Sequence, residues 1–126
     1  MPTYGEAFQS LCEFECLEPN WDSYGAAEIA WSALTFARTW LDAFRTDCVA
    51  APSVIPTNRG GLQFEWHHNG WDVECEIGPE GYWRTYLLAR HDNLIPDYEE
   101  VDDPCDREIW KIVRKPIDNP IVTVLV

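Results

Sequence analysis

The residues best placed to do chemistry lie where two runs of alternating polar and apolar residues flank Asn69-Gly70. Asn-Gly between alternating runs predicts a hairpin with a two-residue type I′ loop. Closing this hairpin at His68 and Trp71 sets Glu65 directly opposite Glu74, with Cβ atoms about 5 Å apart. Carboxylates at that spacing repel each other unless a cation intervenes, so the pair is a candidate metal site or acid–base site.

The same register sorts the remaining hairpin residues onto two faces. The apolar face carries Leu62, Phe64, Trp66, Val73, Cys75 and Ile77, and the polar face carries Gln63, Glu65, His67, Asp72, Glu74 and Glu76. Oxygen-rich ligands suit magnesium, calcium or manganese, so a metal-assisted hydrolase that uses the polar face is one hypothesis. The face has no recognisable catalytic motif. We therefore predict a solvated or salt-bridged face with no metal, no cofactor and no catalytic residue, on which Glu65→Gln stabilises the fold.

The cysteines are a second candidate site, and there are five of them: Cys12, Cys16, Cys48, Cys75 and Cys105. Cys12 and Cys16 are one helical turn apart and could form a zinc site with His67 and His68, although the spacing is atypical. The odd number and the absence of a C-x-x-C pair argue against a disulfide framework and a zinc ribbon. Because Cys12 falls on an apolar helical stripe and Cys75 on the apolar strand face, we expect reduced, buried thiols.

Residues 91–106 form a third candidate, with seven acidic residues and no lysine or arginine. The composition predicts a loop, either simply solvated or able to dock on a basic, partly apolar surface. Together with the polar face of the hairpin, this loop supplies the predicted partner-binding residues, which are Glu65, Asp72, Glu74, Glu76, Asp97, Tyr98, Glu99, Glu100, Asp102 and Asp103.

The overall charge limits the kinds of partner. The chain has 22 Asp and Glu against 9 Lys and Arg, which gives a net charge of −13. Neutralising phosphates requires clustered lysine and arginine, so direct binding to nucleic acid is excluded and an anionic membrane surface is disfavoured. No secretory signal or membrane-spanning stretch is present, so we expect a cytoplasmic protein, in the host cell if a phage encodes it. The partner expected for such a protein is a basic protein, and the sequence leaves the oligomeric state open.

The elements that must position these residues fit one domain over residues 1–126, because 46% of the residues are hydrophobic and seven Trp, five Tyr and five Phe can form a core. Apolar residues at helical spacing predict helices over 4–17 and 26–44, within a helical part that spans 4–44. The period then changes to two, which predicts a β-meander over 53–88. The acidic loop (91–106) and a C-terminal segment with a last strand (107–126) follow. The predicted fold class is α+β, with two N-terminal helices packed on one face of an antiparallel β-meander of four to five strands.

The segment between the predicted helices, Asn20-Trp-Asp-Ser-Tyr-Gly25, combines turn-forming residues with two aromatic residues. Asp22 or Ser23 can cap the following helix, and Trp21 and Tyr24 can pack beneath it. An aromatic pair beside an aspartate could instead hold a small cation or a sugar. We favour the capping interpretation.

Two motifs carry a resemblance: Asn20-Trp-Asp-Ser-Tyr-Gly-Ala26 and Pro56-Thr-Asn-Arg-Gly-Gly-Leu-Gln-Phe-Glu-Trp66. Through them the chain resembles a group of small bacterial and phage proteins, mostly of uncharacterised function, that share an N-W-D-x-Y-G-A turn and a P-T-x-x-G-G-x-x-x-E-W hairpin. The likeness covers about residues 10–80. It implies a family but no particular chemistry.

Together these observations predict a non-enzymatic acidic module that binds another protein. Its negative surface would occupy a basic nucleic-acid-binding surface, as DNA-mimic inhibitors of the anti-CRISPR or anti-restriction type do. An antitoxin or immunity protein for a cationic toxin would use the same electrostatics. The metal-dependent hydrolase is the third hypothesis.

Overall fold

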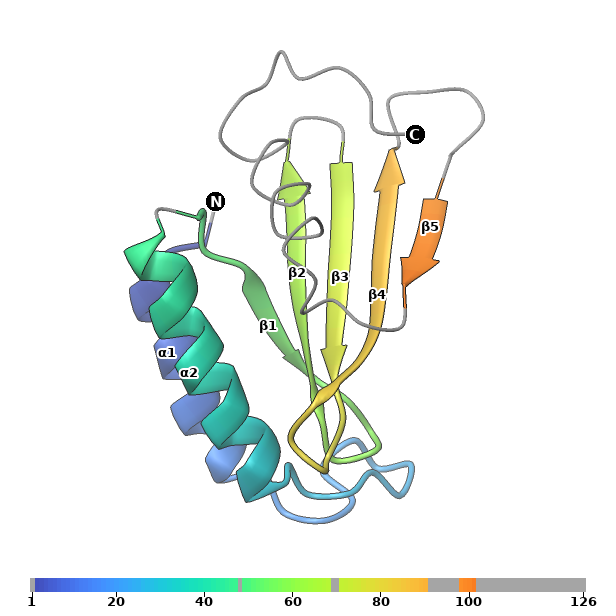
Figure 1. Cartoon of the computed structure of the whole chain (residues 1–126). Helices are drawn as coiled ribbons and strands as arrows, with labels where there is room; N and C mark the ends of the chain where they lie inside the picture. Colours follow the sequence, from blue (N-terminus) through green and yellow to red (C-terminus); the bar gives the residue numbers. More distant parts are fainter. Residues whose placement is uncertain (1, 48, 69–70, 91–97, 102–126) are drawn as a thin grey trace.

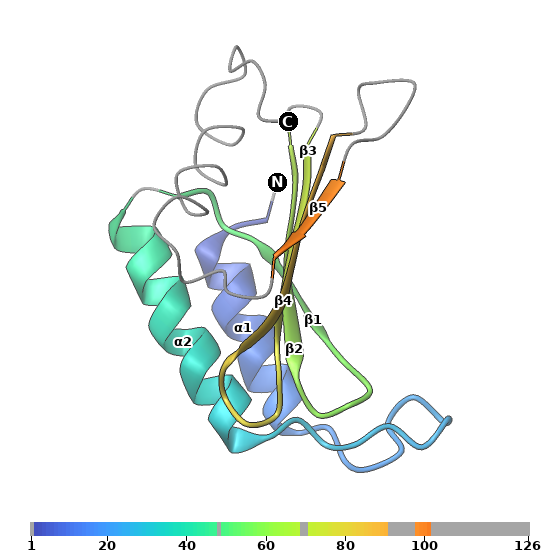
Figure 2. The same ribbon diagram turned by 45° about the vertical axis from the view of Figure 1, so that its right-hand side comes forward.

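The computed structural model describes residues 2–47, 49–68, 71–90 and 98–101. The element order is α1 (Tyr4–Glu15), α2 (Trp31–Thr46), β1 (Ser53–Pro56), β2 (Leu62–His68), β3 (Trp71–Ile77), β4 (Trp83–Arg90) and β5 (Tyr98–Val101). The strands form one antiparallel sheet in sequence order, and the two helices lie side by side against one of its faces (Figures 1 and 2). The predicted α+β architecture is therefore confirmed. Neither described helix is long and apolar enough to cross a bilayer.

The hairpin has the predicted register. Leu62 pairs with Ile77, Phe64 with Cys75 and Trp66 with Val73, and these six side chains are buried beneath the helices. The pairing of His68 with Trp71 leaves two residues between the strands, as the Asn-Gly signal predicted. The turn type falls outside the described residues.

Helix α1 begins and packs as its sequence predicts, with one exception. The Thr3 Oγ1 accepts a hydrogen bond from the Glu6 backbone N–H at 3.1 Å, which caps the helix, and Leu11 is fully buried. Cys12 is exposed, so the prediction that its thiol is buried is wrong. Helix α2 covers the stripe centred on Leu11, and Cys12 lies about 100° further round the helix.

Helix α2 begins at Trp31, five residues later than predicted. Residues 26–30 instead form an irregular segment, because their backbone bonds to the β1–β2 turn. The N–H of Ala27 donates to the Asn58 carbonyl at 2.9 Å, and the N–H of Ala30 donates to the Gly60 carbonyl at 2.9 Å. Alanine is the strongest helix former, but helix propensities differ by less than about 1 kcal/mol per residue, so these two tertiary hydrogen bonds determine where the helix starts.

The Asn20–Gly25 segment is a closed loop and does not cap the helix, so the capping interpretation is wrong. Asp22 Oδ1 accepts from the backbone N–H groups of Tyr24 and Ala26 at 2.8 and 3.0 Å, within its own loop. The N-cap of α2 is Ala30, whose side chain makes no hydrogen bond. Trp21 packs against the core, whereas Tyr24 is 91% exposed. Asparagine and aspartate favour such local bonds, and the structure uses them for a turn.

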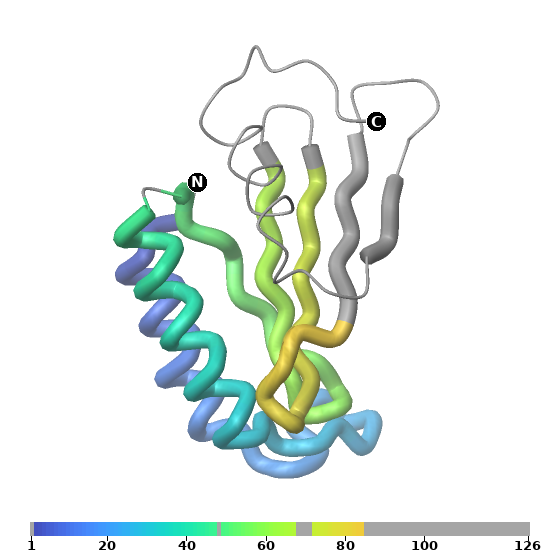
Figure 3. The backbone as a smooth tube through the Cα atoms, viewed as in Figure 1, coloured from blue at the N-terminus to red at the C-terminus, as the bar shows by residue number. Residues whose placement is uncertain are grey.

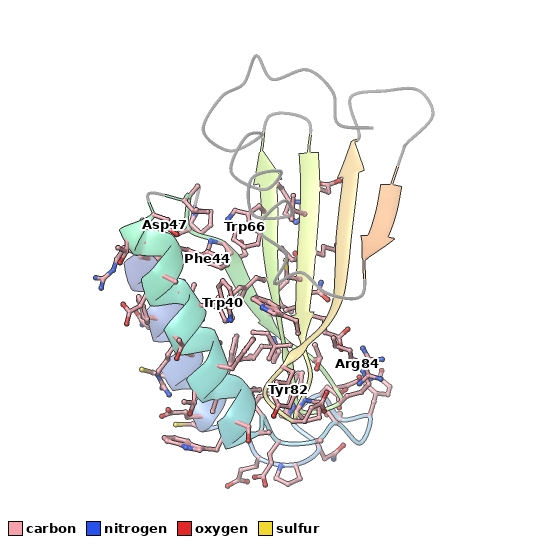
Figure 4. All side chains as sticks on the ribbon, in the orientation of Figure 1. Trp40, Phe44, Asp47, Trp66, Tyr82 and Arg84 are labelled. Carbon is pink, nitrogen blue, oxygen red and sulfur yellow. The ribbon has the colours of Figure 1, made fainter. Side chains whose placement is uncertain are left out.

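An aromatic cluster fills the space between α2 and the sheet. Trp40 and Phe44 extend from the helix toward the strands, and Phe44 makes edge contacts with Phe64 and Trp66 at centroid distances of 6.0 and 5.4 Å (Figure 4). The Trp66 indole N–H donates to the Ala50 carbonyl at 2.7 Å. Aromatic pairs in these geometries stabilise a core beyond the area that they bury.

The predicted acidic loop over 91–106 is partly wrong, because residues Tyr98–Val101 form strand β5. This strand pairs with β4, for example Glu100 with Leu87. Charged strands are common at the edges of sheets. Strand β5 contains few apolar residues, so the sequence gives little indication that this segment is a strand. The predictions for residues 107–126 fall outside the described part of the chain.

Candidate functional site

The polar face of the hairpin, here called the sheet face, lies on the side of the sheet away from the helices. It consists of Gln63, Glu65, His67, Asp72, Glu74 and Glu76. Glu65 pairs directly with Glu74, as predicted. Four carboxylates thus share a small surface, and each of them is buried or half-buried.

His67 joins two of these carboxylates. Its Nδ1 lies 2.5 Å from Asp72 Oδ1, and its Nε2 lies 3.1 Å from Glu65 Oε2. The hydrogen bonds to Asp72 and then to Glu65 raise the pKa of His67. The imidazolium form therefore supplies the cation that the opposed glutamates require.

Glu76 is neutralised by arginine. It is 8% exposed, and the Arg59 Nη2 lies 2.7 Å from each of its carboxylate oxygens. The Nε of Arg84 lies 3.9 Å from Glu76 Oε2. Charge-assisted hydrogen bonds of this kind satisfy a carboxylate that has little access to water.

Glu74 differs from its neighbours because no described cation lies within ion-pair distance of its carboxylate. Burial, followed by the charge of Glu65, raises its pKa. The charge of Glu74 therefore costs the fold stability.

This geometry gives no support to a metal-assisted hydrolase. Both ring nitrogens of His67 are bonded to carboxylates, so neither has a lone pair directed at a metal ion. Within the described ranges, no group of three or more His, Cys, Asp or Glu residues is arranged to hold a metal. The zinc alternative lacks support for the same reason: Cys12 on α1 and Cys16, the C-cap of α1, are exposed, and in the described part of the chain neither belongs to a group of three metal ligands. Cys75 is buried, as predicted, and burial raises its thiol pKa.

The predicted partner-binding residues fall into three groups. The structure brings Glu65, Asp72, Glu74 and Glu76 together on adjacent strands. It places Tyr98, Glu99 and Glu100 on β5, which β4 separates from β3. The remaining three, Asp97, Asp102 and Asp103, fall outside the described residues. No single described surface contains them all.

A second acidic region lies where the connecting segments meet, at one end of the molecule. Residues 16–30, the β1–β2 turn (57–61) and the β3–β4 turn (78–82) gather there beside the start of α2, and we call this region the loop end (Figure 3). It exposes Glu18, Glu28 and Glu80. Among the described residues, no cation pairs with these three carboxylates.

The arginines near the loop end are already engaged. Arg59 donates hydrogen bonds to Glu76, Arg84 lies within ion-pair distance of the same carboxylate, and Arg38 pairs with Glu15. The hydrogen bond to Glu15 raises the pKa of Arg38. The negative charge of the loop end is therefore available to a partner, whereas most of the charge on the sheet face is not.

A groove with aromatic walls opens beside these carboxylates, between α2 and the β3–β4 turn. Its volume is about 420 Å³, and its lining residues are Trp31, Ser32, Thr35, Phe36, Thr39, Trp40, Glu80, Gly81 and Tyr82. Trp31 and Tyr82 are 70% and 67% exposed, which is unusual for large aromatic side chains. We call this feature the aromatic groove.

Sequence reasoning missed the aromatic groove because its two walls are 50 residues apart in the chain. The one available signal was Pro79-Glu-Gly81, a turn motif followed directly by two aromatic residues. Gly81 has φ +88°, and a Cβ there would lie 3.0 Å from the Ser32 carbonyl oxygen and from its Cβ. The glycine therefore allows the turn to pack directly against α2.

Comparisons with protein-family models, with curated protein sequences and with solved structures give no match to this chain. The arguments on function therefore rest on the residues and geometry described above.

Proposed function

We propose that this chain is a non-enzymatic acidic module that binds a basic surface of another protein. One observation carries the proposal: between residues 2 and 84, nine carboxylates lie outside the sheet face, eight of them are exposed, and only Glu15 and Asp42 pair with an arginine among the described residues. The nine are Glu6, Glu13, Glu15, Glu18, Asp22, Glu28, Asp42, Asp47 and Glu80.

Such a distribution favours a cationic partner for a physical reason. Unpaired surface carboxylates produce a long-range negative field that speeds the encounter with a positive surface and aligns the two proteins. The sheet face adds to this field but offers fewer free charges for contact. We therefore propose the loop end as the main contact region, and Glu99 and Glu100 on the edge strand β5 as a second one.

The partner that we propose is a nucleic-acid-handling protein, whose phosphate-binding surface is basic by necessity. The chain would then act as an inhibitor that occupies this surface in place of DNA or RNA. Inhibitors of the anti-CRISPR or anti-restriction type act in this way, and we propose that the chain is one of them.

Competition with DNA tests this function. Restriction and CRISPR nucleases are each loaded with a fluorescent DNA duplex, and the chain is added at about 50 mM and about 200 mM salt. We expect displacement of the duplex from at least one nuclease, with an apparent affinity that falls roughly tenfold or more at the higher salt concentration. Absence of displacement from every nuclease at low salt, or displacement that salt does not change, overturns the proposal.

Charge-matched variants identify the contact region. Glu18→Gln with Glu28→Gln, and Glu65→Gln with Glu74→Gln, each remove two of the 13 net negative charges. Two exposed charges at a contact contribute about 1 kcal/mol to the free energy of binding. We therefore expect the Glu18 and Glu28 variant to displace DNA roughly fivefold more weakly, and the Glu65 and Glu74 variant to show a smaller loss. A larger loss with the second pair would assign the contact to the sheet face.

A further inference from the structure

We propose that the aromatic groove binds an arginine side chain presented by the basic partner. This inference rests on the proposed function, and it specifies the residue that the partner inserts. The argument uses the shape and chemistry of the groove, the arginine contacts within the chain itself, and the charge around the groove.

The chemistry of the groove suits a guanidinium group. Trp31 and Tyr82 present largely exposed rings, and the acidic residue Glu80 belongs to the same lining. A guanidinium stacks on aromatic faces while its N–H groups donate to a carboxylate. A lysine ammonium is a compact, strongly hydrated charge that stacks less well. The volume of about 420 Å³ is sufficient for an arginine side chain and part of its backbone.

The chain already makes this kind of contact with its own arginines. The guanidinium carbon of Arg38 lies 6.0 Å from the centre of the Trp31 ring, and that of Arg45 lies 5.9 Å from the Phe8 ring. Because Arg38 is also paired with Glu15, it holds the exposed Trp31 ring in place. A wall that is fixed before binding loses less conformational entropy when the partner arrives.

The packing beneath the groove also fixes its shape. Phe36 and Trp40, which line its floor, contact Trp83 at centroid distances of 5.2 and 5.3 Å. Gly81 holds the turn against Ser32, as described above. The groove is therefore preformed, and the negative charge of the loop end favours a cationic occupant.

Hexaarginine and hexalysine serve as probes of equal charge. The intrinsic tryptophan fluorescence of the full chain reports their binding at about 50 mM salt. If only the long-range field acts, the two probes bind equally well. If the groove stacks a guanidinium, hexaarginine binds roughly fivefold or more tightly than hexalysine.

Matched variants connect this preference to the groove. We expect Tyr82→Ala and Glu80→Gln each to reduce the affinity for hexaarginine to that for hexalysine. Tyr24→Ala and Glu28→Gln are the controls, because Tyr24 and Glu28 are exposed loop-end residues outside the groove lining. Both controls should keep the preference. Far-ultraviolet circular dichroism checks that every variant is folded.

The possible outcomes separate this inference from the proposed function. Equal binding of the two probes, or equal losses with Tyr24→Ala and Tyr82→Ala, overturns the arginine inference but leaves the acidic binding module intact. If neither probe binds at low salt, both proposals fail. A dimer in sedimentation velocity that Tyr82→Ala dissociates would show that a second copy of this chain covers the groove, which also overturns the inference.

Discussion

The sheet face and the loop end are both rich in carboxylates, yet the structure treats them in opposite ways. On the sheet face, His67 bonds to Glu65 and Asp72, and Arg59 bonds to Glu76. At the loop end, Glu18 and Glu28 are exposed, and neither forms an ion pair with a described cation. The density of acidic residues in a sequence therefore does not reveal which charges a partner can reach.

Geometry explains the difference. Carboxylates on paired strands are held about 5 Å apart and cannot separate, so the fold must supply cations among them. Carboxylates in loops can point into water, where a charge costs little and needs no partner. The loop end can therefore keep its negative charge for an intermolecular contact.

One of the two largest expected effects comes from removing the arginine that neutralises a buried carboxylate. Arg59→Met leaves Glu76, which is 8% exposed, without its main cation. We expect a loss of about 2 kcal/mol in the free energy of unfolding, less than for a fully buried pair because Arg59 is half-exposed.

Arg45→Met is the matched control for Arg59→Met, because the pair of Arg45 with Asp42 is exposed on both sides. Arg45→Met should lower the free energy of unfolding by less than about 0.5 kcal/mol. Urea denaturation measures both values. Equal losses would contradict the contrast between the neutralised sheet face and the solvated charges elsewhere.

The next effect concerns two loop-end glycines with similar backbone angles. Gly25 and Gly81 have φ of +83° and +88°, but a Cβ at Gly25 meets no atom within 4 Å, whereas a Cβ at Gly81 meets Ser32 at 3.0 Å. Gly25→Ala should lower the free energy of unfolding by about 1 kcal/mol, from backbone strain alone. Gly81→Ala should lower the free energy of unfolding by about 2 kcal/mol, because the steric contact with Ser32 adds to the strain.

Thermal unfolding of the two alanine variants, combined with the hexaarginine assay, tests whether the aromatic groove depends on close packing of the turn. Gly81→Ala should also weaken the preference for hexaarginine, and Gly25→Ala should keep it. Similar stabilities for the two variants would indicate that the turn can move away from α2 at little cost.

A pH titration examines the histidine on the sheet face. The pKa of His67 is raised in the folded state, so its stabilising contribution is complete below the unfolded value of about 6.5 and is lost as the pH rises through the folded value. We expect the free energy of unfolding to fall across this window by roughly 1 kcal/mol or less, because His67 is half-exposed. His67→Gln should abolish that decrease. An unchanged pH profile in the variant would show that His67 does not neutralise the glutamates.

The smallest effect is a gain in stability. Since the pKa of Glu74 is raised, its charged form is disfavoured in the folded state, and its contribution is lost as the pH rises above the ordinary glutamate value. Glu74→Gln should therefore stabilise the fold at neutral pH by about 0.5 kcal/mol.

Glu65→Gln, for which the sequence predicts stabilisation, should instead lose stability, because Glu65 accepts hydrogen bonds from His67 and Gln63. Chemical denaturation at neutral pH distinguishes the two, and a gain for Glu65→Gln alone would reverse the assignment.

The hairpin was predictable because its information is local. The alternation of polar and apolar residues defines the two faces, and Asn69-Gly70 sets the register between them. The start of α2 was not predictable in this way, because residues 26–30 have helical composition and yet pair with the β1–β2 turn. A contact between segments 30 residues apart leaves no periodic signal in either of them.

The sequence by itself determined the fold class, the face of the sheet that is buried, the opposition of Glu65 and Glu74, and the excess of negative charge. Each of these follows from composition or from spacing over a few residues. Only the tertiary structure decided which carboxylates are neutralised and where exposed aromatic residues form a groove. Those properties depend on how side chains from separate elements, such as Arg59 with Glu76 and Trp31 with Tyr82, come together in space.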